Sequence, residues 1–299
     1  MTLQKDNTPL AVLIIVMTVF VLTLGDAAIK GMSTDLRLWQ IFIIRSGVAL
    51  PVLILLIRMR FSHLSLWPMH PGWAALRSAM LAMMWVLYYA ALPHLELSLA
   101  AAAYYTLPLF ITMFSAIFVG DRVGWTGWIA VAIGFVGVLV ILRPASDTFT
   151  PMALLPLGSA ILYALAMILT RTKCRAEHPL VLSAMLNVGF IVTGVAASLV
   201  LLAIGRTTSD FLSPLWSPLN LTAIGALGLM TVAILLGSIG TSIAYQIGRS
   251  STVATFDFTY VGFATIWGVV FFAERPDGLA LTGIALIVLA GLLAMKRRV

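Results

Sequence analysis

The chain is dominated by long apolar runs separated by short stretches of charged residues, Gly and Pro. A helix needs about 20 mostly apolar residues to cross a hydrocarbon layer of roughly 30 Å. No alternation typical of barrel strands is visible, and unpaired backbone amides in lipid cost several kcal/mol, so we predict that each run is a membrane-spanning helix. The ten predicted spans are approximately Pro9–Gly31, Leu38–Ile57, Gly72–Leu92, Leu97–Gly120, Gly124–Leu142, Pro151–Thr172, Pro179–Gly205, Leu219–Gly248, Thr252–Ala273 and Gly278–Met295.

One apolar stretch is long enough to hold two short spans. Residues 211–248 carry no charge over 38 positions. Pro214 and Pro218 make its first part a poor helix, because proline lacks a backbone N–H and clashes with the preceding turn. We therefore predict one long or tilted span here, which keeps the total at ten.

The composition indicates lipid as the solvent for most of the surface. Of the 299 residues, 61% are hydrophobic and 10% are charged, and the mean hydropathy is +1.07. Soluble domains carry about 25% charged residues, because a folded surface must be hydrated. A soluble globular domain and a disordered chain are thereby excluded. The single cysteine, Cys174, excludes an internal disulfide framework.

The charges and histidines indicate which partners to expect. The net charge is +7, but Lys and Arg lie singly between apolar runs, so we expect the lipid bilayer and a small molecule as partners and no nucleic acid. The sequence has no phosphate-binding loop, and its histidines lack metal-ligand spacing: His63, His70, His94 and His178. We expect no enzymatic activity, no cofactor and no metal, and a monomer or weak dimer.

Positive residues in the loops predict the orientation. With the amino terminus in the cytoplasm, eleven Lys and Arg residues fall on the inner side and five on the outer side. Cytoplasmic loops carry the excess of such residues, so we predict both termini inside, which an even number of spans allows. The apolar run from Leu10 is too long for a signal-peptide core and is interpreted as a retained first span.

The second half of the chain repeats part of the first. A shift of 153 positions places Ser98–Arg122 over Ser251–Arg275 with seven identities in 25 positions, and both ranges end in an acid–Arg pair. We divide the chain into halves of five spans, residues 1–147 and 148–299, and an odd number of spans forces the second half to enter the bilayer from the opposite side. The predicted fold class is an all-α polytopic membrane protein with ten transmembrane helices in two inverted five-helix repeats. Such repeats are typical of secondary transporters.

These features resemble the drug/metabolite transporter superfamily and its EamA-type ten-helix members. The resemblance rests on the two halves, on the acid–Arg turn in each, and on glycines in the last span of each half: Gly134, Gly137, Gly283 and Gly291. Within the superfamily the sequence looks most like the bacterial aromatic amino-acid exporters. The resemblance implies an exporter in the bacterial inner membrane, a central cavity lined by spans 1–4 and 6–9, and spans 5 and 10 at the periphery.

The expected function is export of small amphipathic metabolites by alternating access, with aromatic and other neutral amino acids as the first choice of substrate. A drug carrier or an organophosphate carrier of the same superfamily is the main alternative. A cationic substrate favours Asp257 and the aromatic residues, whereas an anionic one requires Lys30, Arg45 and Arg77 to face the cavity. An intramembrane enzyme and a channel are further alternatives.

Apart from Arg171 at the end of the sixth span, five charged residues lie within the predicted spans, where an ionised side chain must pair or face water. Asp26 and Lys30 are four residues apart and share a helix face, so they either form an ion pair or act together on a zwitterionic substrate or as an outer gate. The candidate roles of Asp257 are to bind an ammonium group, to take a proton, or to pair with Arg45 or Arg77. The candidate roles of those two arginines are to bind a substrate carboxylate, to contribute to gating, or to form salt bridges between helices.

Five aromatic side chains lie deep in the predicted spans and are candidates for a substrate cage: Trp85, Tyr104, Tyr105, Tyr163 and Trp267. Packing in the core is the alternative, and either way a buried hydroxyl or indole N–H requires a partner. Tyr88, Tyr89 and Tyr245 lie near span ends and stay unassigned. Tryptophans at span ends are predicted to anchor at the headgroup region: Trp39, Trp67, Trp73, Trp125, Trp128 and Trp216.

Three further positions bear on helix shape and packing. Pro108, in the middle of the fourth span, is predicted to kink that helix. Gly237 and Gly240, in the eighth span, allow close approach of a neighbouring helix. In a transporter such a surface can slide or rock, and in any polytopic protein it can simply pack.

Overall fold

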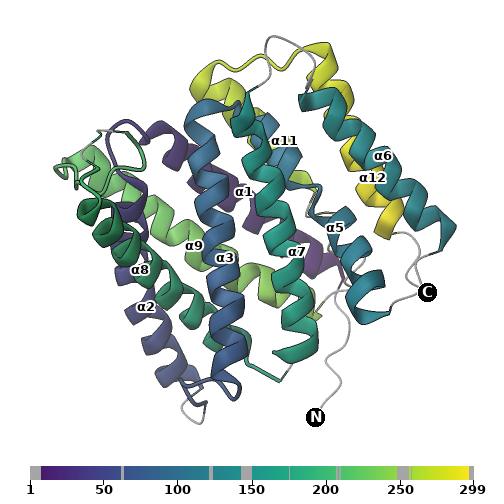
Figure 1. Cartoon of the computed structure of the whole chain (residues 1–299). Helices are drawn as coiled ribbons and strands as arrows, with labels where there is room; N and C mark the ends of the chain where they lie inside the picture. Colours follow the sequence, from purple (N-terminus) through teal and green to yellow (C-terminus); the bar gives the residue numbers. More distant parts are fainter. Residues whose placement is uncertain are drawn as a thin grey trace.

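The computed structural model describes residues 8–61, 64–120, 124–142, 150–174, 176–206, 208, 210–247, 256 and 258–295 (Figure 1). Its α-helices are α1 (Thr8–Gly31), α2 (Leu38–Arg60), α3 (Pro71–Ala91), α4 (Leu97–Tyr104), α5 (Leu107–Phe114), α6 (Trp125–Leu142), α7 (Leu155–Lys173), α8 (Pro179–Ala203), α9 (Leu221–Ile247), α11 (Thr259–Phe272) and α12 (Gly278–Met295). Short 3₁₀ turns η1 (Leu92–His94) and η3 (Pro151–Leu154) and a π-helical turn η2 (Ser115–Val119) adjoin them.

Seven helical segments of the described chain are long and apolar enough to cross a membrane. Three shorter apolar helices complete the set: Gly127–Leu142, Thr259–Phe272 and Gly278–Ala290. Each of the ten predicted spans therefore corresponds to a helical segment, and the predicted all-α polytopic fold is confirmed.

The long uncharged stretch holds one helix, as predicted. Residues 210–220 lie in turns, bends and irregular chain, and α9 begins only at Leu221. This connector is bonded to the start of α2, where Leu38 N donates to Phe211 O at 2.9 Å. The amide side chain of Gln40 accepts the backbone N–H of Ser217 at 3.0 Å and donates to its backbone carbonyl at 2.9 Å. The connector thus bonds several of its polar backbone groups to a helix instead of forming a second span.

The prediction that Trp39 anchors at the headgroup region is wrong. Its side chain is only 7% exposed, and its indole N–H donates to Leu212 O at 2.9 Å. The ring packs edge-on against Phe42. A position near the end of a span suggested an interface, but the connector before α9 covers this end of α2.

The fourth span is interrupted in its middle. Helix α4 ends at Tyr104 and α5 begins at Leu107, one residue before Pro108. Pro108 has no N–H to give to the carbonyl four residues earlier, so a continuous helix would leave that carbonyl unsatisfied. In the intervening turn the Thr106 hydroxyl donates to Ala103 O at 2.7 Å. The break brings Tyr104 and Tyr105 to the junction of the two half-helices.

The principal helix contacts between the two halves have equivalent contacts in which the halves change places. Counted by span, α1 corresponds to α7, α2 to α8, α3 to α9, α4 and α5 to α11, and α6 to α12. Helix α1 packs against α9 and α11, and its counterpart α7 packs against α3 and against α4 and α5. In the same way, α2 contacts α9 and its counterpart α8 contacts α3. Three further contacts join a helix to its own counterpart: α2 to α8, α4 to α11 and α6 to α12. Two related halves of five spans predict these pairings. The boundary drawn at residue 147 stays a prediction, since residues 143–149 lie outside the described ranges.

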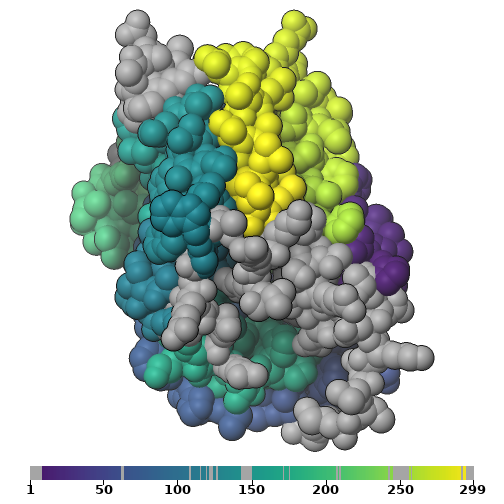
Figure 2. Space-filling model, turned by 90° about the vertical axis from the view of Figure 1, so that its right-hand side faces the viewer, coloured from purple at the N-terminus to yellow at the C-terminus, as the bar shows by residue number. Residues whose placement is uncertain are grey.

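Helices α6 and α12 pack mainly on each other and lie at one edge of the bundle (Figure 1). Figure 2 shows them side by side on the surface, α6 in teal and α12 in yellow. Large apolar side chains on both helices are exposed, among them Phe135, Leu139, Leu281 and Leu289. An apolar outer face of this kind suits contact with lipid.

Small residues bring α1 and α9 together at the centre of the bundle. A Cβ atom added to Gly25 of α1 would come within 2.7 Å of Ala233 on α9. Gly237 and Gly240 of α9 likewise leave no room for a Cβ, because Leu22 and Thr18 of α1 lie against them. The two glycines singled out in the sequence therefore lie at the interface that forms one wall of the pocket described below.

Candidate functional site

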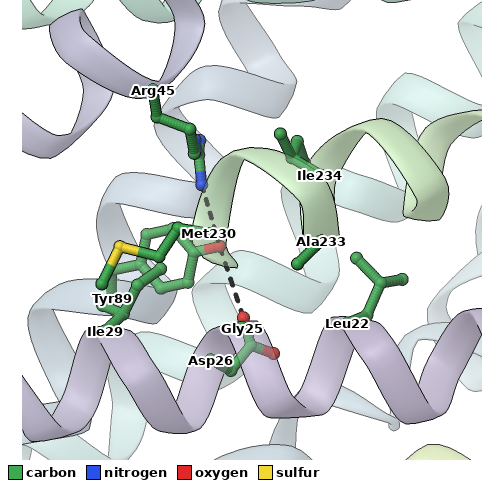
Figure 3. Close-up of a pocket in the computed structure, with 9 residues that line it drawn as sticks. All are labelled: Leu22, Gly25, Asp26, Ile29, Arg45, Tyr89, Met230, Ala233 and Ile234. Atoms are coloured by element: carbon green, nitrogen blue, oxygen red, sulfur yellow. Dashed lines mark hydrogen bonds between the residues drawn. The ribbon is translucent and has the colours of Figure 1, made fainter. Parts of the chain in front are cut away.

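A pocket lies between α1, α2, α3 and α9, with about 200 Å³ of empty space that includes room open to solvent (Figure 3). Its lining is mostly apolar, with three polar side chains among nine residues: Leu22, Gly25, Asp26, Ile29, Arg45, Tyr89, Met230, Ala233 and Ile234. Apolar walls with a few converging polar groups are typical of small-molecule sites. Two of the polar groups, Asp26 and Arg45, are of opposite charge.

Asp26 lies on α1 with 3% of its surface exposed. Its two carboxylate oxygens accept hydrogen bonds from phenols of two other helices, Tyr260 of α11 at Oδ2 and Tyr89 of α3 at Oδ1, the latter at 3.4 Å. Tyr260 is in turn 3.2 Å from the hydroxyl of Tyr88. In the described chain no Lys or Arg forms a salt bridge with Asp26, so hydroxyl groups alone bond directly to this carboxylate.

Arg45 lies on α2 and is 1% exposed. Its Nη1 donates to the Tyr89 hydroxyl at 3.5 Å, so Tyr89 bridges the guanidinium to Asp26 (Figure 3). Within the described residues, Nε and Nη2 have no hydrogen-bond partner. The guanidinium also lies 4.7 Å from the ring centroid of Phe190 and 5.4 Å from that of Phe42. Cation–π contacts contribute about 0.5–2 kcal/mol, less than the several kcal/mol that burying a charge costs.

Aromatic rings form a continuous cluster beside the pocket. Trp85 lies 4.8 Å from Tyr89, centroid to centroid, and Tyr104 lies 5.2 Å from Tyr88. The cluster, which we call the aromatic cluster, comprises Trp85, Tyr88, Tyr89, Tyr104, Tyr105, Tyr163 and Tyr260. Four of the five aromatic candidates from the sequence are thus brought together. The fifth, Trp267, is instead bonded through its indole N–H to Thr23 of α1 at 3.1 Å.

Lys30 does not pair with Asp26, although the two share a face of α1. Its ammonium group is 2.5 Å from the carboxylate of Glu274, lies over the Phe272 ring and donates to Leu95 O. The interpretation of Asp26 and Lys30 as an internal ion pair is therefore wrong. Spacing along one helix shows which side chains can meet, but here other helices bring a better partner to each.

The partner of Lys30, Glu274, also caps a helix. Its two oxygens accept from Leu97 N, the first residue of α4, at 2.9 and 2.8 Å. A carboxylate is stabilised there by the unpaired N–H groups and the positive end of the helix dipole. Ala273, with φ of 52°, makes the turn that directs Glu274 towards α4. We call Lys30, Glu274 and Leu97 the latch, because they join α1, α11 and α4 at one end of the bundle.

Arg77, the remaining charged candidate that the structure describes, does not line the pocket. Arg77 of α3 donates through Nε to the Thr170 hydroxyl of α7 at 2.6 Å, and its Nη1 has no partner among the described residues. Asp257 lies outside the described residues. In the part of the chain that the structure describes, no group of three His, Cys, Asp or Glu residues is placed to hold a metal.

Two residues of this site were missed by the sequence analysis. Tyr89 lies near the predicted end of a span, a position that assigns it no role, yet it joins Asp26 to Arg45. Tyr260 was not considered, although a phenol in an apolar span requires a hydrogen-bond partner. That requirement, applied to every tyrosine in the spans, is the signal that points to both residues.

Comparisons with known proteins agree with this fold. The profile of the EamA-like transporter family matches residues 9–143. The riboflavin transporter of Rhizobium johnstonii is 31% identical over 231 residues, which cover 76% of this chain and 71% of that protein. The pseudopaline exporter CntI of Pseudomonas aeruginosa strain UCBPP-PA14 is 29% identical over 280 residues, 93% of each chain.

More distant matches add to the picture. The S-adenosylmethionine uptake transporter of Rickettsia felis is 25% identical over 193 residues, covering 64% of this chain and 61% of that protein. A protein of known crystal structure matches with a TM-score of 0.64 and 18% identity over 98% of this chain and all of the other, a likeness that bears on the fold alone. The names of these relatives do not include an aromatic amino acid, so that substrate stays a prediction.

Proposed function

The chain belongs to the EamA-like transporter family of multi-pass membrane proteins, and from this premise we propose that it is a secondary carrier for small amphipathic metabolites. We take aromatic and other neutral amino acids as its substrates and export from the cytoplasm as its direction. In this proposal the carrier lies in the bacterial inner membrane with both termini in the cytoplasm, as a monomer or weak dimer.

The observation that carries this proposal is a buried carboxylate in a pocket that adjoins the aromatic cluster (Figure 3). Asp26 offers a negative charge to a substrate amino group, because a carboxylate in an apolar site is stabilised by a cation. The rings of Trp85 and Tyr89 offer faces and edges to a substrate ring. An amino group next to an aromatic ring therefore matches the site.

Alternating access provides the mechanism in this proposal. The exchange of contacts between the two halves allows two arrangements of similar energy, one open to each side. With both termini in the cytoplasm, the latch lies at the periplasmic end, where it joins α1 to α4 and α11. Release of substrate to the periplasm then requires these helices to separate.

The relatives support a carrier of ring-bearing metabolites. Riboflavin and S-adenosylmethionine, the substrates in two of their names, both contain aromatic ring systems, and the pseudopaline protein is named as an exporter. A cationic drug is the second candidate, favoured by the same carboxylate and rings. The two candidates differ in whether the substrate carries a carboxylate group.

Counterflow in proteoliposomes tests the proposal. Vesicles loaded with unlabelled phenylalanine, tyrosine or tryptophan should accumulate the labelled amino acid transiently, which a channel cannot do. Asp26→Asn should reduce this flux by about tenfold or more, since it removes a charge that bonds the substrate. Asp35→Asn, at an exposed position beyond the end of α1, serves as the matched control and should leave the flux unchanged. Absence of saturable flux for every amino acid would refute the proposed substrates.

A further inference from the structure

The guanidinium of Arg45 is only partly hydrogen-bonded by the described residues. Nη1 bonds to Tyr89, while Nε and Nη2 have no hydrogen-bond partner in the described chain. Those two nitrogens lie on the same edge of the planar group, where their N–H bonds run parallel. This is the edge that receives the two oxygens of a carboxylate in a bidentate pair.

No group on the surrounding helices supplies that pair in the described residues. Asp26 is the acid that shares the pocket with Arg45, but Tyr89 lies between them and Tyr260 bonds to its second oxygen. The rings of Phe42, Phe190 and Tyr89 surround the guanidinium and offer no oxygen atom to its free edge except the Tyr89 hydroxyl already bonded to Nη1. The described residues therefore leave a buried, charged donor edge beside the pocket without an acceptor, and a ligand in the pocket can supply one.

We propose that Arg45 binds a carboxylate group of the transported molecule, so that the pocket selects substrates that carry both a carboxylate and an amino group. This inference rests on the proposed function in taking the pocket as the substrate site. Asp26 and Arg45 then hold opposite ends of one zwitterionic group, with Tyr89 between them. A simple amine would leave the edge of Arg45 unpaired.

A phosphate fits the same edge of a guanidinium but suits this pocket less well. A phosphate monoester carries up to two negative charges close to the Asp26 carboxylate, and the described lining offers one positive side chain, Arg45. A zwitterion brings one charge of each sign and satisfies both. The pocket therefore favours a carboxylate, and a phosphate is an outcome that the test can show.

The first test compares inhibitors of counterflow that share one ring. Phenylalanine carries both groups, phenethylamine lacks the carboxylate and 3-phenylpropionate lacks the amine. In the wild-type protein, phenethylamine should inhibit at least about tenfold more weakly than phenylalanine, as expected when a charged hydrogen-bonding group loses its partner. Arg45→Gln should remove this difference. Equal inhibition by phenylalanine and phenethylamine in the wild type would overturn the role of Arg45 while leaving transport itself in place.

The second test does not depend on transport. Phenylacetate should raise the thermal unfolding temperature of the purified protein more than neutral phenylacetamide, and Arg45→Gln should abolish the difference. Arg60→Gln, at an exposed position on the same helix, should preserve it. Arg45→Lys keeps the charge without the forked edge and should retain only part of it, which gives a second reading where Arg45→Gln fails to fold.

The two tests separate the failure of each idea. A carboxylate effect that requires Arg45, together with no flux of any amino acid, supports the carboxylate site and refutes the proposed substrates. Equal stabilisation by phenylacetate and phenylacetamide, or an undiminished difference in Arg45→Gln, refutes the carboxylate site. Stronger stabilisation by phenyl phosphate than by phenylacetate would replace the carboxylate with a phosphate.

Discussion

Two sets of buried charges begin on the same helix, one turn apart, and differ in how fully they are paired. In the latch, Lys30 contacts Glu274 at 2.5 Å and the carboxylate also accepts the N–H of Leu97. In the pocket, Asp26 and Arg45 are separated by the hydroxyl of Tyr89, and two guanidinium nitrogens have no partner among the described residues. Helix α1 thus contributes Lys30 to a completed ion pair and Asp26 to a set of charges that is not directly paired in the described residues.

The difference separates a structural role from a binding role. A buried ion pair with all its hydrogen bonds made has no remaining affinity for a ligand, and breaking it from one side is costly. An incomplete pair leaves that affinity available to a molecule that enters the pocket. Mutations in the latch should therefore act on stability and on the separation of the periplasmic ends of these helices, whereas mutations in the pocket should act mainly on substrate binding.

The largest effect on stability is expected from Glu274→Ala. It leaves the Lys30 ammonium buried without its carboxylate and Leu97 N–H without its acceptor, which should cost about 3–5 kcal/mol in the free energy of unfolding. Unfolding of the purified protein in mixed detergent measures this. Asp210→Ala breaks the exposed pair with Arg206 and should cost less than about 1 kcal/mol. A similar small loss for Glu274→Ala would mean that the latch is not a stabilising pair.

A double mutant gives the coupling within the latch. Lys30→Met with Glu274→Gln should be more stable than the sum of the two single effects, by about 2 kcal/mol, because no charge is left unpaired. The amide oxygen that replaces the Glu274 carboxylate in the double mutant can still accept the N–H of Leu97. Additive effects in the unfolding measurements would show that the two side chains act independently.

Crowding the latch should also destabilise the protein. A Cβ at Gly268 would collide with the Glu274 carboxylate, so Gly268→Ala should cost about 2 kcal/mol. Gly262→Ala on the same helix meets nothing within 4 Å and is the matched control. Unchanged or improved stability for both variants would show that Glu274 can move aside without loss.

A moderate effect is expected for the phenol that holds Asp26. Tyr260→Phe removes a hydrogen bond to a carboxylate and should cost about 1.5 kcal/mol. Tyr88→Phe removes a hydroxyl whose contact, at 3.2 Å, is with the neutral Tyr260, and should cost less. The order of the two unfolding energies is the measurement, and the reverse order would argue against an ionised Asp26.

The smallest effect on stability should come from Asp26→Asn, below about 1 kcal/mol. A buried charge with no direct cationic partner among the described residues gains little from its ionised form. Its amide still offers hydrogen-bond partners to the two phenols. The same variant should lose transport, as described above, so stability and flux are measured on one preparation. A large loss of stability would place Asp26 with the latch as a structural group.

The spans could be predicted from the sequence, while most partners of their polar side chains could not. Hydrophobic runs set the positions of the helices, and the prolines before α9 showed that one helix occupies the long stretch. The partner of Lys30 lies 244 positions away, and the tyrosine that joins Asp26 to Arg45 lies on a third helix. Periodicity shows which face of a helix a residue occupies, but the neighbours of that face depend on how all the helices pack.

The connector before α9 has a consequence for how the molecule can move. Three residues at the start of α2 are hydrogen-bonded to the connector, at Phe211, Leu212 and Ser217. The connector follows α8 and precedes α9 in the chain, so these bonds hold the start of α2 to both helices. At that end of the molecule, α2, α8 and α9 should therefore move as one unit, and relative motion should occur between this unit and the other helices. Spin labels on the exposed positions Leu215 and Val48 should keep a fixed separation during turnover. The separation between labels on Leu215 and Trp125, an exposed residue of α6, should change during turnover.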